Sequence, residues 1–359
     1  MAELWFGLLG LMLIAYVVLD GFDFGAGMLH LFVAKTDAER RTVLAAIGPF
    51  WDGNEVWLIA AGGVLFLSFP EVLTTAFPAF YLALHLVLWC FALRGVAIEV
   101  RSHVTDALWR SFWDAVFAVA SLLLALLFGV AFGNLIRGVP VDASREFTMP
   151  FFTDFRTTGE VGLLDWYSLS VGLLAVTALS CHGAAFLAWR TQGTVREESV
   201  RLERSLWPVL AALFVLVSAE TCVVRPDLFS SLVQRPLGSL GIALSVAGAF
   251  SWAIARRRAW DGRAFLGSCA LLVGVLGAAG AAVFPVFLHS TLAPQFDLDA
   301  RHPGHNSIAM KFALGWWPFA FLLAVSYFVN VFRANKARVS AEDYSGAQED
   351  HPVEKSASS

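Results

Sequence analysis

The stretch PFWDGNEVWLIAAGG, residues 49–63, lies in a segment that is long and apolar enough to cross a bilayer, yet it carries Asp52 and Glu55. An Asp at the centre of a membrane helix costs about 2.5–3.5 kcal/mol on insertion scales, so such a group usually faces a protein interior or a water-filled cavity. The spacing of three residues puts both carboxylates on one helix face. A similar pair, Asp20 and Asp23, lies one predicted helix earlier. Two acidic pairs on consecutive helices indicate a functional site.

The composition is that of a membrane protein. The chain has 359 residues, of which 58% are hydrophobic and 15% are charged. Soluble domains are about 45–50% apolar and about 25% charged, so the sequence predicts an integral membrane protein. The four cysteines fall in apolar segments without a CxxC pair, which argues against a disulfide framework and against a zinc site. The N-terminus, MAELWFGLLG, has no basic region, and we interpret it as the first span rather than a signal peptide.

The hydrophobic segments define the expected fold. A span needs about 20 mostly apolar residues. We predict an all-α bundle of about nine transmembrane helices, at residues 5–33, 43–69, 76–100, 112–136, 161–189, 206–224, 237–255, 264–288 and 309–333. Eighteen of the 25 Lys and Arg residues fall on the side of the first connection, which is therefore cytoplasmic. The N-terminus is then outside and the C-terminus cytoplasmic. We expect one polytopic membrane domain, 1–337, and a polar, disordered tail, 338–359.

The buried charges can be ordered by predicted depth at about 1.5 Å per helical residue. From the cytoplasmic side the order is Asp114 and Glu99, then Arg94, then Asp23 and Asp52 near mid-membrane, then Glu55. Carboxylates can relay protons inside a membrane when a nearby cation restrains the effect of burial. The ladder therefore predicts a proton or ion path. The alternative is an interhelical ion-pair network that fixes packing, with Asp20 facing Asn54 across the first helix pair.

Other residue types give weaker signals. Glycines of the two acidic stretches, Gly21, Gly25, Gly27, Gly62 and Gly63, are expected to permit close helix approach. Membrane histidines can bind haem, but His85, His182 and His289 have no matched partner, so we assign no metal ligand. Basic residues cluster only in short inner loops, which makes nucleic acid an unlikely partner. We assign packing roles within the motifs to Asp20, Gly21, Gly25, Trp51, Gly53, Asn54 and Trp57.

Four stretches resemble subunit II of the cytochrome bd-type quinol oxidases. They are YVVLDGFDFGAGML at 16–29, IGPFWDGNEVWLIAAGGVLFLSFP at 47–70, AFGNLIRGVP at 131–140 and LDWYSLSVGLLAVTALSCHGAAFLAWRTQG at 164–193. The resemblance covers nearly the whole membrane region. Asp23 and Asp52 match acidic positions of the family motifs, and Arg94 and Asp114 match its charged positions on the third and fourth helices.

The resemblance implies a multi-pass protein of the bacterial inner membrane that forms a heterodimer with a haem-bearing subunit I, often with a small single-span accessory subunit. Subunit I would carry haem b and haem d, and quinol oxidation would reduce O2 to water without proton pumping. Subunit II would carry no catalytic residue. It would stabilise the complex among membrane lipid, contribute to a cytoplasmic proton path and be able to hold a structural quinone.

The last loop departs from the family pattern. Many members have a Trp-Asp-Ala-Ser-Ser-like stretch before the last helix, whereas this chain has FDLDARHPGHNSIAMKFALGWWPF at 296–319. Two other functions stay open from the residues alone. Mid-membrane carboxylates also occur in proton-coupled secondary transporters, although no interrupted helices are evident in matching halves. The chain could also be a scaffold whose carboxylates serve packing only.

Overall fold

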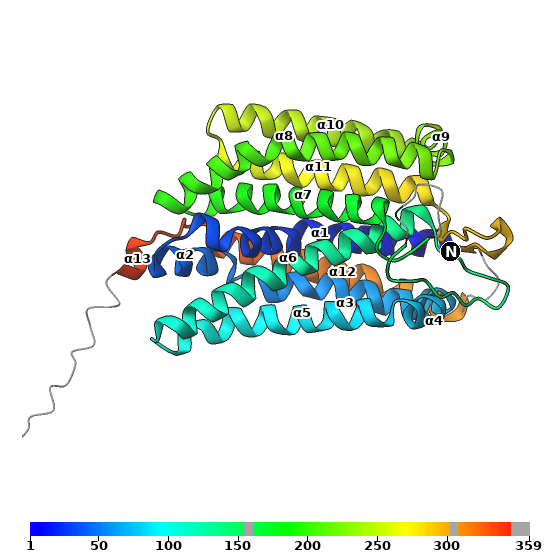
Figure 1. The fold of residues 1–359 in the computed structure, drawn as a ribbon, viewed down its shortest axis with the longest axis horizontal. Coiled ribbons are helices and arrows are strands. Elements are labelled where there is room, and N and C mark those ends of the chain that lie inside the picture. The colour runs from blue at the N-terminus through cyan, green and yellow to red at the C-terminus, as the bar shows by residue number, and fades with distance from the viewer. Residues whose placement is uncertain (154, 156–160, 302–306, 346–359) are drawn as a thin grey trace, which may run out of the picture.

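Long helices lie side by side along the long axis of the molecule (Figure 1). The computed structural model describes residues 1–359 except 154, 156–160, 302–306 and 346–359. The helices are α1 (Ala2–Val33), α2 (Asp37–Ile47), α3 (Trp51–Ser68), α4 (Pro70–Ala79), α5 (Tyr81–Val100), α6 (Ala107–Arg137), α7 (Trp166–Arg190), α8 (Gly193–Val224), α9 (Asp227–Gln234), α10 (Pro236–Arg257), α11 (Asp261–Val283), α12 (Ser307–Ala334) and α13 (Glu342–Ser345). Short 3₁₀ turns span Arg101–His103 and Pro294–Phe296, and strands β1 (Val286–Leu288) and β2 (Leu298–Asp299) pair antiparallel.

The prediction of about nine spans is confirmed in the described part of the chain. Eight helices there are long and apolar enough to cross a membrane, and α3 with α4 forms a further candidate that is bent by 116°. Pro70 is the first residue of α4 and follows the bend. Proline lacks a backbone N–H and is accommodated at a helix start. The N-terminus and α13 lie at opposite ends of the bundle (Figure 1).

Three predicted boundaries are wrong. The span expected at 43–69 is divided, because α2 ends at Ile47 and α3 begins at Trp51. Gly48 and Pro49 stand at this break, and proline has no backbone N–H with which to continue the hydrogen-bond ladder of α2. α8 begins at Gly193 rather than near 206. α11 ends at Val283, so the last part of the span predicted at 264–288 lies in β1.

The polar tail begins later than predicted. The backbone N–H of Val339 donates to the carbonyl of Arg190, and Gln192 N–H donates to the carbonyl of Val339. The short helix α13 then packs near α2. The first part of the segment expected at 338–359 is therefore structured, and the rest of that prediction, 346–359, lies outside the described residues.

Helix α1 is the centre of the bundle, in contact with α3, α6, α7 and α11. All residues from Asp20 to His30 are buried, as expected for a helix surrounded on every side. A Cβ at Gly25 would lie 2.6 Å from Cα of Gly183, so α1 and α7 meet backbone to backbone. In contrast, Gly62 and Gly63 face open space, and their predicted role in helix approach within this chain is wrong.

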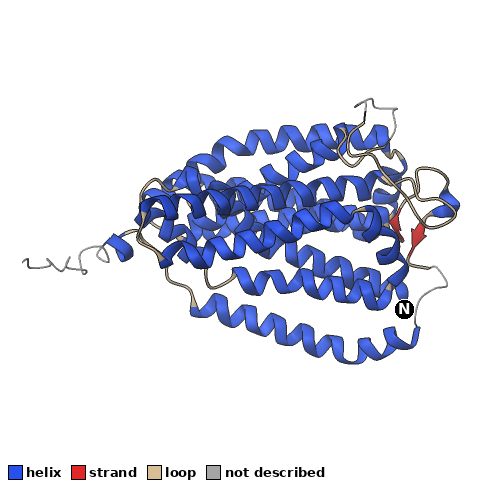
Figure 2. Ribbon diagram, turned by 60° about the horizontal axis from the view of Figure 1, so that its bottom comes forward, coloured by secondary structure: helices blue, strands red, loops and turns tan. Residues whose placement is uncertain are grey.

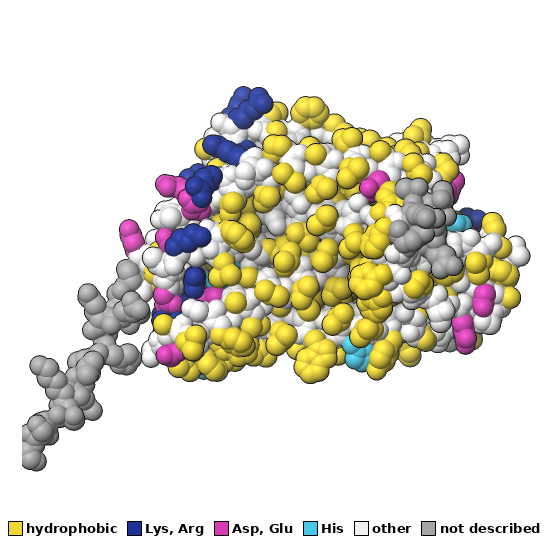
Figure 3. Space-filling view, viewed as in Figure 1, with side chains coloured by type: hydrophobic (Ala, Val, Ile, Leu, Met, Phe, Trp, Pro, Cys, Tyr) yellow, Lys and Arg dark blue, Asp and Glu magenta, His cyan; other side chains and the backbone are white. Residues whose placement is uncertain are grey.

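Helix α12 lies at the edge of the bundle, beside α3. Several of its large apolar side chains are exposed, among them Phe312 and Phe319. Apolar side chains cover the middle of the molecule, whereas charged ones gather toward its two ends (Figure 3). The strands lie at the end that holds the N-terminus (Figure 2). This distribution fits a bilayer around the middle of the bundle.

Candidate functional site

A buried guanidinium joins three helices in the interior of the bundle. Nη2 of Arg94, on α5, donates to Oδ1 of Asp20 on α1 at 2.7 Å and to Oε1 of Glu55 on α3 at 2.6 Å. The side chains of Arg94 and Asp20 are fully buried, and that of Glu55 is 25% exposed. The Arg94 guanidinium also lies over the ring of Phe24, 4.6 Å from its centroid. Arg94 is therefore the electrostatic link between α1, α3 and α5.

Asp23 is held by an amide rather than by a cation. Nδ2 of Asn54 donates to Oδ2 of Asp23 at 2.7 Å and to the carbonyl of Leu19 at 3.1 Å. The prediction that Asn54 faces Asp20 is therefore wrong, because Asn54 contacts the carboxylate one turn further along α1. We call Asp20, Asp23, Asn54, Glu55 and Arg94 the carboxylate cluster. It contains three carboxylates and one guanidinium.

Asp52 and Glu99 do not join the carboxylate cluster. Both are exposed on the surface of the chain. Asp52 stands in the first turn of α3, two residues before Asn54, so its depth is close to that of Asp23 although its side chain faces outward. Trp51 covers Gly95, where a Cβ would lie 3.5 Å from the indole, so α3 and α5 are adjacent here. Asp52 and Glu99 therefore flank the carboxylate cluster on neighbouring helices.

Asp114 belongs to a different cluster, at the end of the bundle where α2 lies. Its Oδ1 is 2.7 Å from Nε2 of His30, and its Oδ2 accepts from Nη1 of Arg40 at 2.8 Å. Arg101 donates to both oxygens of Asp114 and also to Asp37. Asp37 in turn pairs with Arg41 and Arg110. We call His30, Asp37, Arg40, Arg41, Arg101, Arg110 and Asp114 the arginine cluster.

The arginine cluster changes the predicted ladder. Asp114 and Glu99 were expected at one depth, but only Asp114 is buried in a network. The sequence analysis missed six members, which come from α1, α2, the turn after α5 and α6: His30, Asp37, Arg40, Arg41, Arg101 and Arg110. The spacing gave one signal, because Asp37 and Arg41 stand four residues apart on one face of α2.

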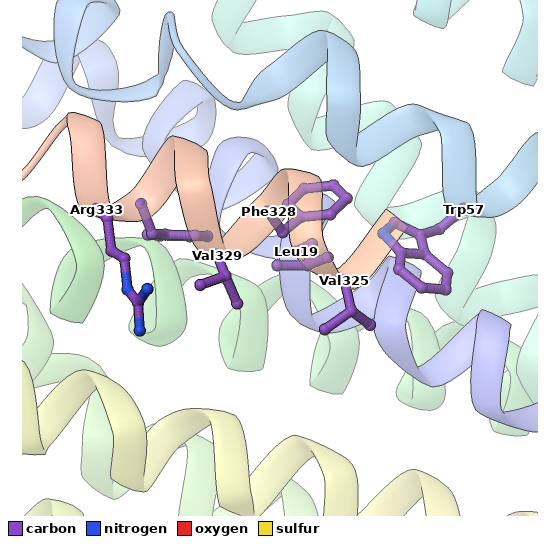
Figure 4. Close-up of a pocket in the computed structure, with 7 residues that line it drawn as sticks. Leu19, Trp57, Val325, Phe328, Val329 and Arg333 are labelled. Atoms are coloured by element: carbon purple, nitrogen blue, oxygen red, sulfur yellow. The ribbon is translucent and has the colours of Figure 1, made fainter. Parts of the chain in front are cut away.

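An apolar groove lies between α12 and the helix pair α1 and α3 (Figure 4). Its volume is about 400 Å³. Leu19 and Trp57 line one side, and Val325, Phe328, Val329, Phe332 and Arg333 line the other. Trp57 is buried, and its indole N–H has no hydrogen-bond partner within the described residues. Gly53, one turn earlier on α3, leaves room for Tyr327, because a Cβ there would lie 3.1 Å from its ring.

The histidines show no arrangement suited to haem iron. In the described part of the chain, His182 uses both ring nitrogens, at 2.8 Å from Oγ of Ser268 and 2.9 Å from the carbonyl of Val18. His30 is bonded to Asp114 and packs against Phe117. His85 is exposed, and His289 contacts Asp297. These residues do not fit a haem pocket.

The chain is similar to known oxidase subunits. The family model for cytochrome bd terminal oxidase subunit II matches residues 1–334. Cytochrome bd-I ubiquinol oxidase subunit 2 of Escherichia coli K12 is 35% identical over 240 residues, 65% of this chain and 62% of that protein. Cytochrome bd ubiquinol oxidase subunit 2 of Bacillus subtilis is 30% identical over 313 residues, 86% of this chain and 88% of that protein. The match thus spans less than two thirds of the E. coli relative.

The fold has a solved counterpart. The structure of bd oxidase from Geobacillus thermodenitrificans superimposes with a TM-score of 0.72 at 18% identity, covering 92% of this chain and 98% of that chain. The likeness to this structure concerns the fold alone. The family match and the candidate membrane spans together make the chain a multi-pass protein of the bacterial inner membrane. The chain belongs to the cytochrome bd terminal oxidase subunit II family.

Proposed function

We propose that this chain is the haem-free partner of a haem-bearing subunit I, and that the pair oxidises quinol and reduces O2 to water without pumping protons. The haem b and haem d would lie on subunit I, since the described histidines here do not fit them. This chain would stabilise the complex in the membrane and carry part of the proton uptake path from the cytoplasm.

One observation carries the proton path: three carboxylates lie together with a single guanidinium in the interior of the bundle, Asp20 and Glu55 bonded to it and Asp23 bonded to Asn54. Full ionisation would leave two uncompensated negative charges, and uncompensated buried charge is costly. Coupled carboxylates of this kind take up and release protons as a group. Glu55 is the partly exposed member and would connect Asp20 to the surface of the chain.

The exposed carboxylates Asp52 and Glu99 would form the entrance of the proton path. Asp52 precedes Glu55 by three residues on α3, and Glu99 follows Arg94 by five residues on α5. An isolated charge facing lipid at this depth would be costly, so a partner surface or water would cover both. We propose that subunit I covers this face and that protons pass from Glu99 and Asp52 through Glu55 toward Asp20 and Asp23.

The groove beside α12 suits the tail of a quinone. Its lining is apolar except for Arg333, and an isoprenoid chain is apolar along its whole length. The Trp57 side chain lines the groove beside Leu19 and adds an aromatic surface to it. These features support a structural quinone in this subunit, with no redox step assigned to it.

The test is the substitution Asp52→Asn, compared with Asp23→Asn, in the intact complex. Asp52 is exposed, so its substitution should leave assembly and haem content unchanged. Loss of a proton-relaying group should lower O2 turnover per haem about 100-fold or more, the contribution typical of positioned proton-transfer groups. Turnover is measured polarographically and normalised to the haem spectrum.

Glu220→Gln is the matched control, because Glu220 is a half-buried carboxylate on α8 that bonds only Ser170 among the described residues. It should retain full turnover. Wild-type turnover in both Asp variants would reject the proton path and leave a scaffold. A purified chain without a haem-bearing partner, from membranes solubilised mildly, would reject the oxidase assignment itself.

A further inference from the structure

A second charged site lies at the α2 end of the molecule, on the side away from α3 and α5. A cleft of about 270 Å³ opens there between the start of α8, the end of α10 and the start of α11. Its charged lining consists of Arg196, Arg204, Arg256, Glu197 and Asp261. Neither the carboxylate cluster nor the arginine cluster includes any of these residues.

Two buried carboxylates in and beside the cleft, Asp261 and Glu203, already form ion pairs with arginines. Asp261 accepts from Nη1 of Arg256 at 2.8 Å, from Nε of Arg196 at 2.8 Å and from Nη2 of Arg338 at 3.2 Å. Glu203 pairs with Nη2 of Arg256 at 2.6 Å. Arg256 is almost wholly buried, and its Nε has no hydrogen-bond partner within the described residues.

The three helices that form the cleft carry arginines without carboxylate partners among the described residues. They are Arg204 on α8, Arg257 and Arg258 at the end of α10, and Arg263 on α11, and all are exposed. The guanidinium carbons of Arg258 and Arg263 lie 5.0 Å and 4.3 Å from the ring centroid of Trp260. We call Arg204, Arg257, Arg258, Trp260 and Arg263 the turn patch.

Apolar side chains continue from the turn patch along the outside of the bundle. Phe250 and Ile254 on α10 and Leu266 on α11 are exposed within about two turns of the patch. A ligand with an anionic head and long apolar chains could contact both surfaces at once. Tryptophan beside arginine is typical of the headgroup level of a membrane.

Positive charge alone does not distinguish the turn patch, because basic side chains gather along the whole α2 end of the molecule (Figure 3). The difference is in their pairing. Arg40, Arg101 and Arg110 of the arginine cluster all bind Asp37 or Asp114. The arginines of the turn patch bind no carboxylate in the described structure, and one of them, Arg204, lines the cleft. Their positive charge is available to an external anion.

We propose that the turn patch binds the phosphate of an anionic phospholipid from the adjoining leaflet, with its acyl chains along Phe250, Ile254 and Leu266. Basic pockets between membrane helices on the cytoplasmic side are suited to such headgroups. The patch is built from α8, α10 and α11, so one headgroup would clamp three helices together. This proposal does not depend on the proton path.

The experiment compares Arg257→Gln/Arg263→Gln with a matched control, Arg201→Gln/Lys336→Gln, in the purified complex. The control removes two exposed charges outside the patch at the same end of the molecule. Delipidated complex is titrated with phosphatidylglycerol or phosphatidylethanolamine, and bound lipid is counted by native mass spectrometry. Removing two membrane-facing arginines should weaken phosphatidylglycerol binding at this site about 30-fold.

Phosphatidylglycerol should raise the thermal midpoint of wild type and control but not of the patch variant. Arg257 also stands at the C-terminus of α10, where it complements the helix dipole, so the lipid-dependent shift is decisive rather than the absolute midpoint. Equal retention in patch variant and control would overturn the proposal. So would equal binding of phosphatidylethanolamine, or full competition by inorganic phosphate, which would indicate a site for a free anion.

Discussion

The two clusters on α1 have opposite charge balances. The carboxylate cluster sets three acids against Arg94, whereas the arginine cluster sets four arginines and His30 against Asp37 and Asp114. Asp23 and His30 stand seven residues apart on one helix face. The contrast is therefore between neighbouring sites on one rigid element.

The difference in charge balance indicates that the carboxylate cluster can exchange protons, whereas the arginine cluster is a permanent ion-pair network. Both oxygens of Asp114 accept from cations, so protonating it would break several charge-assisted bonds. Oδ1 of Asp23 and Oδ2 of Asp20 have no hydrogen-bond partner within the described residues. A proton can be added at these oxygens without displacing a bond. The arginine cluster instead ties α1, α2 and α6 together.

The largest effect is expected from Arg94→Gln. This change removes the only cation of the carboxylate cluster and leaves the buried Asp20 and the partly exposed Glu55 without a cationic partner. Removing one member of a buried pair typically costs about 3–5 kcal/mol. We expect little assembled complex, measured as haem-containing complex per milligram of membrane protein. Asp20→Asn in the same chain should restore part of the yield. A wild-type yield of Arg94→Gln would show that Arg94 is dispensable for stability.

Asp114→Asn should lower stability without lowering turnover. Arg101 and Arg40 lose a fully buried carboxylate, and hydrogen bonds to charged groups contribute about 1.5–3 kcal/mol each. The thermal midpoint of the purified complex should fall, while O2 turnover per intact haem stays at the wild-type level. This pattern is the reverse of that expected for Asp52→Asn. Loss of turnover at unchanged stability would place Asp114 in the proton path.

The sequence predicts the spans well because apolar length is a local property. The acidic pairs on α1 and α3 likewise mark the region of the site, since charge in a span is costly wherever the helix points. The break between α2 and α3 had a local signal, a proline after a glycine at residues 48 and 49. The span prediction nevertheless continued across it, because the residues on both sides are apolar.

The pairing within the clusters could not be predicted, because it depends on how each helix is rotated against its neighbours. A turn of about 100° per residue decides that Asn54 faces Asp23 while Asp52 faces outward. The arginine cluster was missed for another reason. Arg40 and Arg101 are among the eighteen basic residues that set the orientation of the spans, and the orientation rule takes no account of what a charge binds.

Gly25→Ala tests the packing against α7 of the part of α1 that carries both clusters. Gly25 lies between Asp23 and His30, and a Cβ there would lie 2.1 Å from the carbonyl oxygen of Leu179. Backbone atoms cannot move aside cheaply, and overpacking typically costs about 1–3 kcal/mol. We expect a lower thermal midpoint and reduced turnover, because both clusters would shift against α7. Gly62→Ala is the control, since Gly62 faces open space and should retain wild-type stability.

The smallest effect concerns the start of α2, which carries Asp37 and Arg40 into the arginine cluster. Oε2 of Glu39 accepts from the backbone N–H of Lys35 at 2.7 Å and of Thr36 at 2.9 Å, and the Thr36 hydroxyl accepts from Glu39 N–H. This is a capping box. Glu39→Ala should cost about 0.5–1 kcal/mol, as loss of a helix cap does.

The pKa of Glu39 determines how its contribution to stability changes with pH. Slight burial raises the pKa of Glu39, but the hydrogen bonds from Thr36 and Lys35 outweigh it, so the folded pKa lies below its usual value. Its stabilisation is therefore present above the unfolded pKa of about 4.3 and is lost as pH falls through the folded pKa. The stability difference between wild type and Glu39→Gln, from denaturant titration, should be constant near neutral pH and shrink below about pH 4. A difference that grows in acid would mean that the Glu39 carboxylate destabilises the start of α2, and the arginine cluster would then hold α2 without help from its cap.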